Sequence, residues 1–313
     1  MSFSPTPKTI EFGRTTGTAT VTTHFTELLQ GVFFSHGGLV RALVTLPCLK
    51  LRTTVTVEIF LDTNRIVANP SNRIKAITAC RKALDYCSMP DRGALISIES
   101  NIPQEIGAGS STGDVVAVIE ATTRAIGKIL PPAAVAYLTV DTEKASDPVM
   151  YRDGSVHLFM HRTGISLEVF PATLPAMRVI GITDGSPVDT DKHPPASYSA
   201  EEITEFDCLR NRLRNAILTQ NVLQLAAVAT RSAHINQRPL PKPHFATWLA
   251  LMDKSGAAGL SVSHSGSAVA FLFDANDRHA PRKEMLLREC LKQLCVPVLV
   301  DFHIGGRHAA RAA

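Results

Sequence analysis

The sequence lacks the features that mark membrane and secreted proteins. It has no uninterrupted apolar stretch of about 18 residues, which a helix needs to cross a bilayer. Residues 1–8 are polar and contain proline, without the apolar core of a secretory signal peptide. We therefore expect a cytoplasmic protein with no membrane partner.

Cysteine is sparse, the net positive charge is low, and the basic residues are scattered along the sequence. No C-x-x-C or H-E-x-x-H pattern occurs, so a clustered metal or redox site is not expected. We predict reduced core residues at Cys48, Cys80, Cys87, Cys208, Cys290 and Cys295. The formal net charge is +4 without a basic stripe, which argues against nucleic-acid binding.

What is present indicates a globular α+β protein. The 313 residues are 45% hydrophobic, enough for one large or two modest domains. Periodicity predicts strands at 53–61, 94–100 and 177–183, a β-hairpin at 157–169, and helices at 74–87, 114–127, 133–144, 201–229 and around Trp248. Residues 185–198 are rich in proline, aspartate and serine, and predict a mobile loop.

Residues 101–114, where an apolar strand gives way to a helix, are the most informative segment. Gly107 and Gly109 allow a tight turn and a close approach to a ligand. The hydroxyls that follow lie where the helix presents unpaired N–H groups. The predicted phosphate cradle is Gly107, Ala108, Gly109, Ser110, Ser111 and Thr112. It is neither a Walker A loop nor a complete G-x-G-x-x-G, and the alternative is a helix start that binds no ligand.

Three segments in order resemble one family. The Pro-x-x-x-Gly-x-Gly-Ser-Ser pattern that starts at Pro103 resembles the ATP-binding motif of the GHMP kinases, with Ala108 at the usual leucine. Residues 17–48, with His-Phe-Thr-Glu-Leu-Leu-Gln-Gly at 24–31, resemble the first GHMP motif, and residues 256–273 resemble the third. Both are similar to the forms found among the L-threonine kinases of cobalamin side-chain synthesis.

The resemblance implies a two-domain fold. A ribosomal S5-like N-terminal domain would span residues 1–170 and a ferredoxin-like C-terminal domain residues 171–313, with the active site between them. It also implies the cofactors ATP and Mg²⁺ and transfer of the γ-phosphate to a hydroxyl. The expected partner is a small-molecule hydroxyl acceptor, a hydroxy amino acid such as L-threonine, and a homodimer is left open.

The same resemblance assigns the chemistry of the site. Ser111 and Glu143 match the groups that hold the metal, and Asp147 matches the acid near the acceptor, which acts as a base or only positions the acceptor. For Glu143 and Asp147 the alternative is an ordinary charged helix end. Lys144 is either a phosphate contact or a cation that the helix dipole favours.

The acceptor pocket is assigned to Glu27, Gln30, Ser265 and Gly266. A carboxylate and an amide suit the ammonium group of an amino acid, although Glu27 could instead cap a helix. For His264, contact with phosphate or acceptor competes with a backbone hydrogen bond. In residues 236–243, Arg238 or Lys242 could bind a substrate carboxylate, but we expect a solvated loop.

Two other functions stay open at this point. One keeps the ATP site and changes the acceptor to homoserine, an isoprenoid alcohol or a sugar. The other is a non-catalytic regulator of the same fold that binds ATP or a metabolite. Thr26, Ala108 and Gly113 depart from the family's pattern and keep the second alternative open, whereas Ser111, Glu143 and Asp147 together argue for catalysis.

Overall fold

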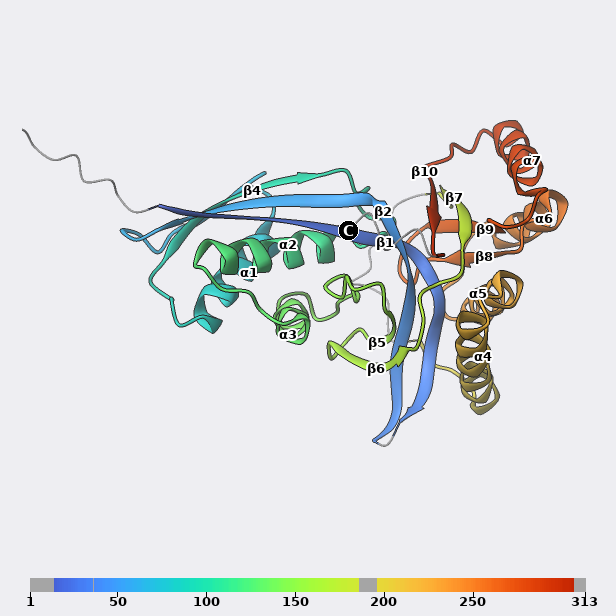
Figure 1. Cartoon of the computed structure of the whole chain (residues 1–313), viewed down its shortest axis with the longest axis horizontal. Helices are drawn as coiled ribbons and strands as arrows, with labels where there is room; N and C mark the ends of the chain where they lie inside the picture. The colour runs from blue at the N-terminus through green and yellow to red at the C-terminus, as the bar shows by residue number, and fades with distance from the viewer. Residues whose placement is uncertain (1–13, 36, 186–195, 307–313) are drawn as a thin grey trace, which may run out of the picture.

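The computed structural model describes residues 14–35, 37–185 and 196–306 (Figure 1). Its strands are β1 (Thr15–Ser35), β2 (Gly38–Phe60), β3 (Ile66–Asn69), β4 (Gly93–Ser100), β5 (Val156–Met160), β6 (Ile165–Phe170), β7 (Met177–Thr183), β8 (Gly259–Val262), β9 (Ala268–Asp274) and β10 (Val300–Ile304). Its helices are α1 (Ile74–Tyr86), α2 (Ser110–Ala125), α3 (Pro132–Glu143), α4 (Ala200–Leu218), α5 (Val222–Asn236), α6 (Phe245–Ser255) and α7 (Ala280–Gln293). The expected α+β class is confirmed.

One sheet runs through the described residues. Its strand order is β10-β7-β9-β8-β1-β2-β4-β3, and the hairpin of β5 and β6 joins it at β2. Strands β1 and β2 pair along their whole length. Figure 1 shows them running beside β4 above α1, α2 and α3, then turning through a strong bend to pass between β5–β6 and α4–α5. Helices α6 and α7 lie beside β7 to β9.

The bend in β1 has a local cause. The register with β2 shifts between Thr22 and Thr23, between His24 and Thr26, and between Glu27 and Leu29. Each extra residue in a strand turns the strand and re-aims its side chains. The side chains from 23 to 30 are therefore all buried, whereas residues 16 to 20 alternate between exposed and buried. This irregular segment coincides with the first GHMP-like motif.

Helix α2 is the buried helix predicted behind the phosphate cradle. Val115, Val116, Val118 and Ile119 are all buried. The helix approaches β1 closely because Gly113 has no side chain: a Cβ there would lie 2.7 Å from Cγ2 of Thr23. The departure from the family's pattern at position 113 thus has a packing reason.

Most predicted elements are confirmed within a few residues, including α1, α2, α3, β4, β7, α6 and the β5–β6 hairpin. The strand predicted at 53–61 is the last part of the longer β2. Residues 186–195, most of the predicted mobile loop, lie outside the described residues. The domain boundary near residue 170 stays a prediction. Within the described residues, no helix is long and apolar enough to cross a membrane.

The single helix predicted at 201–229 is wrong. The chain forms α4 and α5 instead, which pack against each other and against β1. Gln220 has a left-handed backbone with φ of 52°, which a continuing helix does not allow. The side chain of Asn221 then accepts a hydrogen bond from the backbone N–H of Gln224 and starts the new helix. The apolar stripe is nearly continuous across this break, which is why periodicity missed it.

The cysteines are only partly as predicted. All six are free thiols. Four are buried, as expected of core residues, but Cys208 and Cys295 are exposed and their core assignment is wrong. Cys208 faces outward from α4, and Cys295 follows the end of α7 with a positive φ of 57°.

Candidate functional site

The phosphate cradle links β4 to α2 and is wedged between two other motifs. Gly107 and Gly109 have φ of 80° and 70°, which favours glycine. A Cβ on Gly107 would lie 2.8 Å from Ser263 Cβ, and one on Gly109 would lie 2.7 Å from His24 Cε1. The two glycines therefore let the cradle contact the first and third motifs at once.

The start of α2 is ready to receive an anion. Gly109 is the residue before its first turn, and no described side chain caps that end. The side-chain oxygen of Ser110 is buried and has no hydrogen-bond partner among the described residues. Free backbone N–H groups and the positive end of the helix dipole favour a phosphate there. The residues present thus fit the nucleotide phosphates that the sequence predicts.

Glu143, the last residue of α3, contacts the cradle. Its carboxylate accepts hydrogen bonds from Ser111 Oγ and, at 3.1 Å, from Thr112 Oγ1. Lys75 Nζ lies 3.5 Å from the same carboxylate. Burial raises the pKa of Glu143, and the hydrogen bond from Ser111 opposes that rise. Hydroxyl and carboxylate oxygens are the ligands Mg²⁺ prefers, so Ser111 and Glu143 fit the metal role predicted for them.

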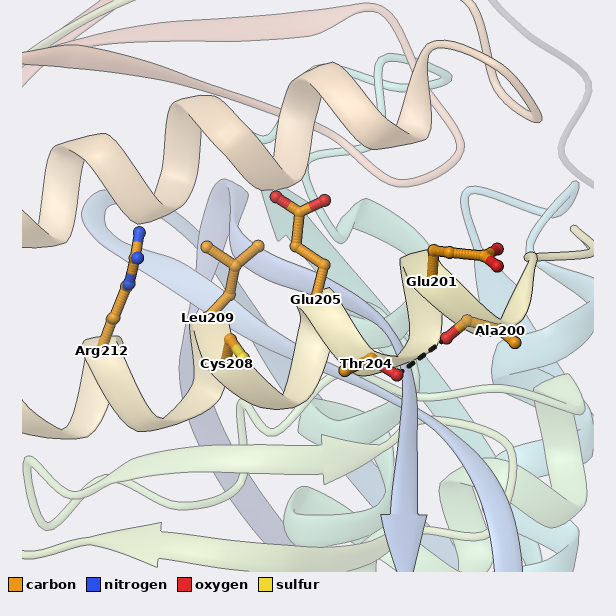
Figure 2. A pocket seen from close by; sticks show the side chains of 7 residues that line it. All are labelled: Ala200, Glu201, Thr204, Glu205, Cys208, Leu209 and Arg212. Carbon is orange, nitrogen blue, oxygen red and sulfur yellow. Dashed lines mark hydrogen bonds between the residues drawn. The ribbon is translucent and has the colours of Figure 1, made fainter.

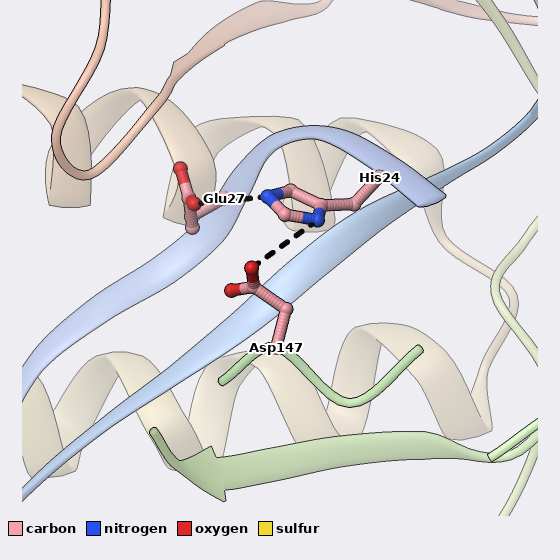
Figure 3. Close-up of side chains that lie close together, drawn as sticks. All are labelled: His24, Glu27 and Asp147. Atoms are coloured by element: carbon pink, nitrogen blue, oxygen red, sulfur yellow. Dashed lines mark ion pairs between the residues drawn. The ribbon is translucent and has the colours of Figure 1, made fainter. Parts of the chain in front are cut away.

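Asp147 lies in the connection after α3. Its Oδ2 is 3.8 Å from Nδ1 of His24, and Nε2 of His24 is 3.6 Å from Oε1 of Glu27 (Figure 3). His24 and Glu27 are 3% exposed, whereas the Asp147 side chain is 18% exposed. In a regular strand residues 24 and 27 would point to opposite faces, but the bulge at Phe25, between His24 and Thr26, brings them to the same side.

The charges in this cluster depend on one another. Burial disfavours the charged form of His24, but the nearby carboxylates, Asp147 first, outweigh it and raise its pKa to about 9. Burial raises the pKa of Glu27, and its contact with His24 opposes that rise. His24 is therefore an imidazolium between two acids at neutral pH.

The third motif closes the site from the opposite side. Its first part is strand β8, and a turn follows at 263–267. His264 Nδ1 donates to Gln30 Oε1 at 2.6 Å. Gly266 must be glycine, because a Cβ would lie 2.1 Å from the carbonyl oxygen of Ile106. Ser265 lies in the same turn between them.

The solvated loop expected at 236–243 is wrong at Asn236, the buried last residue of α5, and at Lys242. Lys242 is 8% exposed, and its Nζ donates to the carbonyl oxygen of Gly266. Burial lowers the pKa of Lys242 to about 8, against the opposing effects of Glu27 and Asp184. Arg238, by contrast, is exposed and pairs with Glu202.

Two further expectations at β1 are resolved by the structure. Glu27 lies inside a strand, so the alternative that it caps a helix is wrong. Thr26 takes the place of a glycine in the family's pattern, and its hydroxyl lies 2.6 Å from that of Ser261 in β8. This departure therefore ties the first motif to the third.

The structure brings the predicted residues into one region built by β1, the cradle, the end of α3 and the third-motif turn. Sequence reasoning missed His24, because a histidine three residues from Glu27 does not share its face in a regular strand. A separate hollow on the outside of α4 holds none of the predicted site residues (Figure 2). It is lined by Ala200, Glu201, Thr204, Glu205, Cys208, Leu209 and Arg212.

Two family models match the chain on either side of its middle. Residues 72–150 match the GHMP kinases N terminal domain, and residues 213–286 match the GHMP kinases C terminal domain. The first match contains the cradle, Glu143 and Asp147, and the second contains the third-motif turn.

Similar proteins carry related names. An L-threonine kinase of Salmonella typhimurium is 28% identical over 197 residues, which are 62% of this chain and 64% of that protein. An L-threonine kinase of Citrobacter freundii is 30% identical over 187 residues, 59% of this chain and 63% of that protein. The matches therefore span less than two thirds of either relative.

Solved structures share the fold over nearly the whole chain. A homoserine kinase from Cytophaga hutchinsonii has a TM-score of 0.65 at 12% identity and covers 96% of this chain and 97% of its own. MDDEF in complex with MVAPP, AMPPCP and magnesium has a TM-score of 0.64 at 15% identity, covering 94% of this chain and 98% of its own. The chain is therefore similar to GHMP kinases in both matched segments and shares the fold of solved GHMP kinases.

Proposed function

We propose that this protein is an ATP-dependent kinase that transfers the γ-phosphate to the hydroxyl of a small hydroxy amino acid resembling L-threonine. The observation that carries the proposal is the contact of the cradle hydroxyls with Glu143, together with Asp147 beside His24, whose ring packs on the same cradle. The first group suits a metal-bound phosphate and the second suits an acceptor hydroxyl. The L-threonine kinases among the relatives support the choice of acceptor.

Phosphoryl transfer depends mainly on positioning and on neutralising charge. The first turn of α2 would bind the phosphate oxygens through its backbone N–H groups, and Ser110 Oγ would donate to one of them. Ser111 and Glu143 would hold Mg²⁺, which neutralises phosphate charge when it is bound. Lys75, half exposed beside Glu143, would remain as a second cation at this edge.

Asp147 would handle the acceptor. Its carboxylate accepts the proton of the acceptor hydroxyl as the acceptor oxygen bonds to the γ-phosphorus. The bond from that phosphorus to the β,γ-bridging oxygen breaks, and its electron pair leaves with ADP. Asp147 is more exposed than His24 and Glu27, which makes it the member of the cluster most accessible to the acceptor hydroxyl.

The two charged ends of an amino acid find complementary groups nearby. Oε2 of Glu27 is buried without a hydrogen-bond partner among the described residues, and it suits an ammonium group. Gln30, Ser265 and Gly266 would line the same pocket. Lys242, whose ammonium makes one hydrogen bond to Gly266, has donors left for a carboxylate.

The test is ADP release with Mg·ATP across hydroxy amino acids, homoserine, mevalonate and sugars, using the wild type beside Asp147→Asn and Ser111→Ala. We expect turnover with L-threonine or a close analogue and a collapse in both variants. Turnover with another alcohol only would keep the kinase and replace the acceptor. ATP binding without turnover on any acceptor would favour a non-catalytic regulator.

A further inference from the structure

His24 occupies a place that the kinase chemistry described above does not use. Its ring lies against the phosphate cradle, where it would be 2.7 Å from a Cβ on Gly109. One ring nitrogen faces Asp147 and the other faces Glu27 (Figure 3). A single side chain from the bulge of β1 thus contacts the nucleotide side and the acceptor side of the site.

The charges around this ring come from separate elements. Asp147 comes from the connection after α3, and Glu27 comes from β1 itself. Lys242, from the segment between α5 and α6, acts on Glu27 from farther away. The cradle contributes only Gly109, which has no side chain. The ring of His24 therefore lies between two carboxyl groups in a buried site.

Without the ring of His24 the two acids would face each other across a poorly solvated gap. Burying unpaired like charges is unfavourable, so one acid would take up a proton or move away. Glu27 is almost fully buried within β1, whereas Asp147 is in an irregular connection and is the one with room to move. A shift of about 1 Å in a reacting group is enough to slow a reaction on the order of 100-fold.

We propose that His24 is a positioning residue for phosphoryl transfer, which holds the Asp147 carboxylate toward the acceptor and separates it from Glu27. The inference rests on the kinase function proposed above. His24 would not touch the acceptor or the reacting phosphate. It would set the place of Asp147 relative to the cradle, because the same ring packs on Gly109.

The experiment compares the wild type with His24→Gln, which keeps a polar side chain without the charge, and with His24→Lys, which restores a cation. We expect His24→Gln to lower kcat on the order of 10- to 100-fold with the KM for ATP nearly unchanged. The acidic limb of its kcat–pH profile should move toward neutral pH, because Glu27 loses the contact that favours its ionised form. His24→Lys should recover part of kcat and return the limb toward that of the wild type.

His303→Gln is the matched control, since His303 is an exposed histidine of β10. If the wild type shows no acceptor-dependent turnover, the kinase proposal is refuted. If the wild type is active and His24→Gln is equally active, only the proposed role of His24 is refuted. A lower kcat with an unmoved pH profile, or no recovery in His24→Lys, would also overturn it.

A second measurement on the wild type covers the case in which the variants do not fold. Nitrogen-15 NMR of the His24 ring should find both nitrogens protonated at neutral pH, and Asp147→Asn should make the ring lose its proton at lower pH. A neutral ring, or a ring nitrogen that binds added Mg²⁺ or Mn²⁺, would contradict the proposal.

Discussion

Glu143 and Asp147 lie four residues apart, and the protein holds them in different ways. Glu143 is held by two hydroxyls of the cradle and by a half-exposed lysine. Asp147 faces the buried ring of His24, which is fixed between the cradle and β1. The αL turn at Lys144, with φ of 68°, ends α3 between the two acids.

The short segment from Glu143 to Asp147 can therefore serve two tasks. The partners of Glu143 are hydroxyls that can also bind a metal and an ammonium that can swing into solvent, so an incoming divalent cation can replace or join them. The partner of Asp147 is a rigid ring that no small ligand needs to displace. We infer that Glu143 is suited to an exchangeable ion and Asp147 to a fixed orientation.

The largest effect should come from the acid with the fixed partner. Asp147→Asn should lower kcat by about 10²- to 10⁴-fold, the usual contribution of a group that takes a proton in the transition state. ATP binding, measured by calorimetric titration, should stay near that of the wild type. Asp141→Asn on the exposed face of α3 is the control and should keep full activity. Equal losses in both variants would remove the special role of Asp147.

Substitution of Glu143, which is suited to an exchangeable ion, should instead change the Mg²⁺ dependence of activity. Glu143→Gln should raise the Mg²⁺ concentration for half-maximal activity on the order of 10- to 100-fold, because a neutral amide is a poor substitute for a carboxylate at a metal. Steady-state rates over a Mg²⁺ series at saturating ATP measure this. Glu99→Gln, exposed on β4, is the control. An unchanged Mg²⁺ dependence in Glu143→Gln would place the metal elsewhere.

His24, the fixed partner of Asp147, should also make the stability of the protein depend on pH. The pKa of His24 is raised from 6.5 to about 9, so its stabilisation is fully present below pH 6.5 and is lost as the pH rises through 9. The loss amounts to roughly 3 kcal/mol in the free energy of unfolding. Urea titrations of the wild type and His24→Gln between pH 6 and 9.5 compare the slopes.

Comparing the pH dependence of stability in the wild type and in His24→Gln separates the contribution of His24 from that of Lys242. Burial lowers the pKa of Lys242 to about 8. Its contribution to the free energy of unfolding therefore has the opposite sign and increases as the pH rises. Both proteins contain Lys242. Parallel stability curves for the wild type and His24→Gln would therefore refute an imidazolium at position 24.

The smallest effect concerns the contact between His24 and the cradle. Gly109 and Gly127 have almost the same φ, 70° and 72°, but only Gly109 is close to another side chain. Alanine at Gly127 should lower the free energy of unfolding by about 1 kcal/mol from the backbone alone. Alanine at Gly109 should lower it by about 1–2 kcal/mol more, because the ring of His24 must shift.

A double-mutant cycle tests that assignment. When His24 is already alanine, the additional loss from Gly109→Ala should shrink to that of Gly127→Ala, as measured by urea unfolding. An additional loss that persists without the ring would mean that the cradle is strained for another reason.

The sequence predicted those parts of the site that depend on local chemistry. Glycines before a helix and hydroxyls in its first turn predicted the cradle, since the turn and the unpaired N–H groups are properties of the chain itself. Pro131 and Pro132 predicted where α3 begins. The positions of Glu143 and Asp147 relative to the cradle came only from resemblance, because four-residue spacing by itself fits an ordinary helix end.

The misses share a physical cause, which is irregular backbone in an otherwise periodic pattern. The bulge at Phe25 brings His24 beside Glu27, and the αL residue Gln220 divides one apolar stripe between two helices. Lys242 was assigned to solvent from its proline-rich surroundings, but the fold places it against Gly266. Periodicity does not encode bulges, single αL residues or contacts between distant segments.

The most direct test of the central claim is to follow the γ-phosphate. Phosphorus-31 NMR of a reaction with Mg·ATP and L-threonine, run for the wild type and Asp147→Asn, identifies the product. We expect a phosphate monoester on the acceptor hydroxyl that grows with ADP in the wild type and hardly forms in the variant. ATP that binds but yields no phosphate ester with any hydroxy amino acid or other alcohol would contradict that claim.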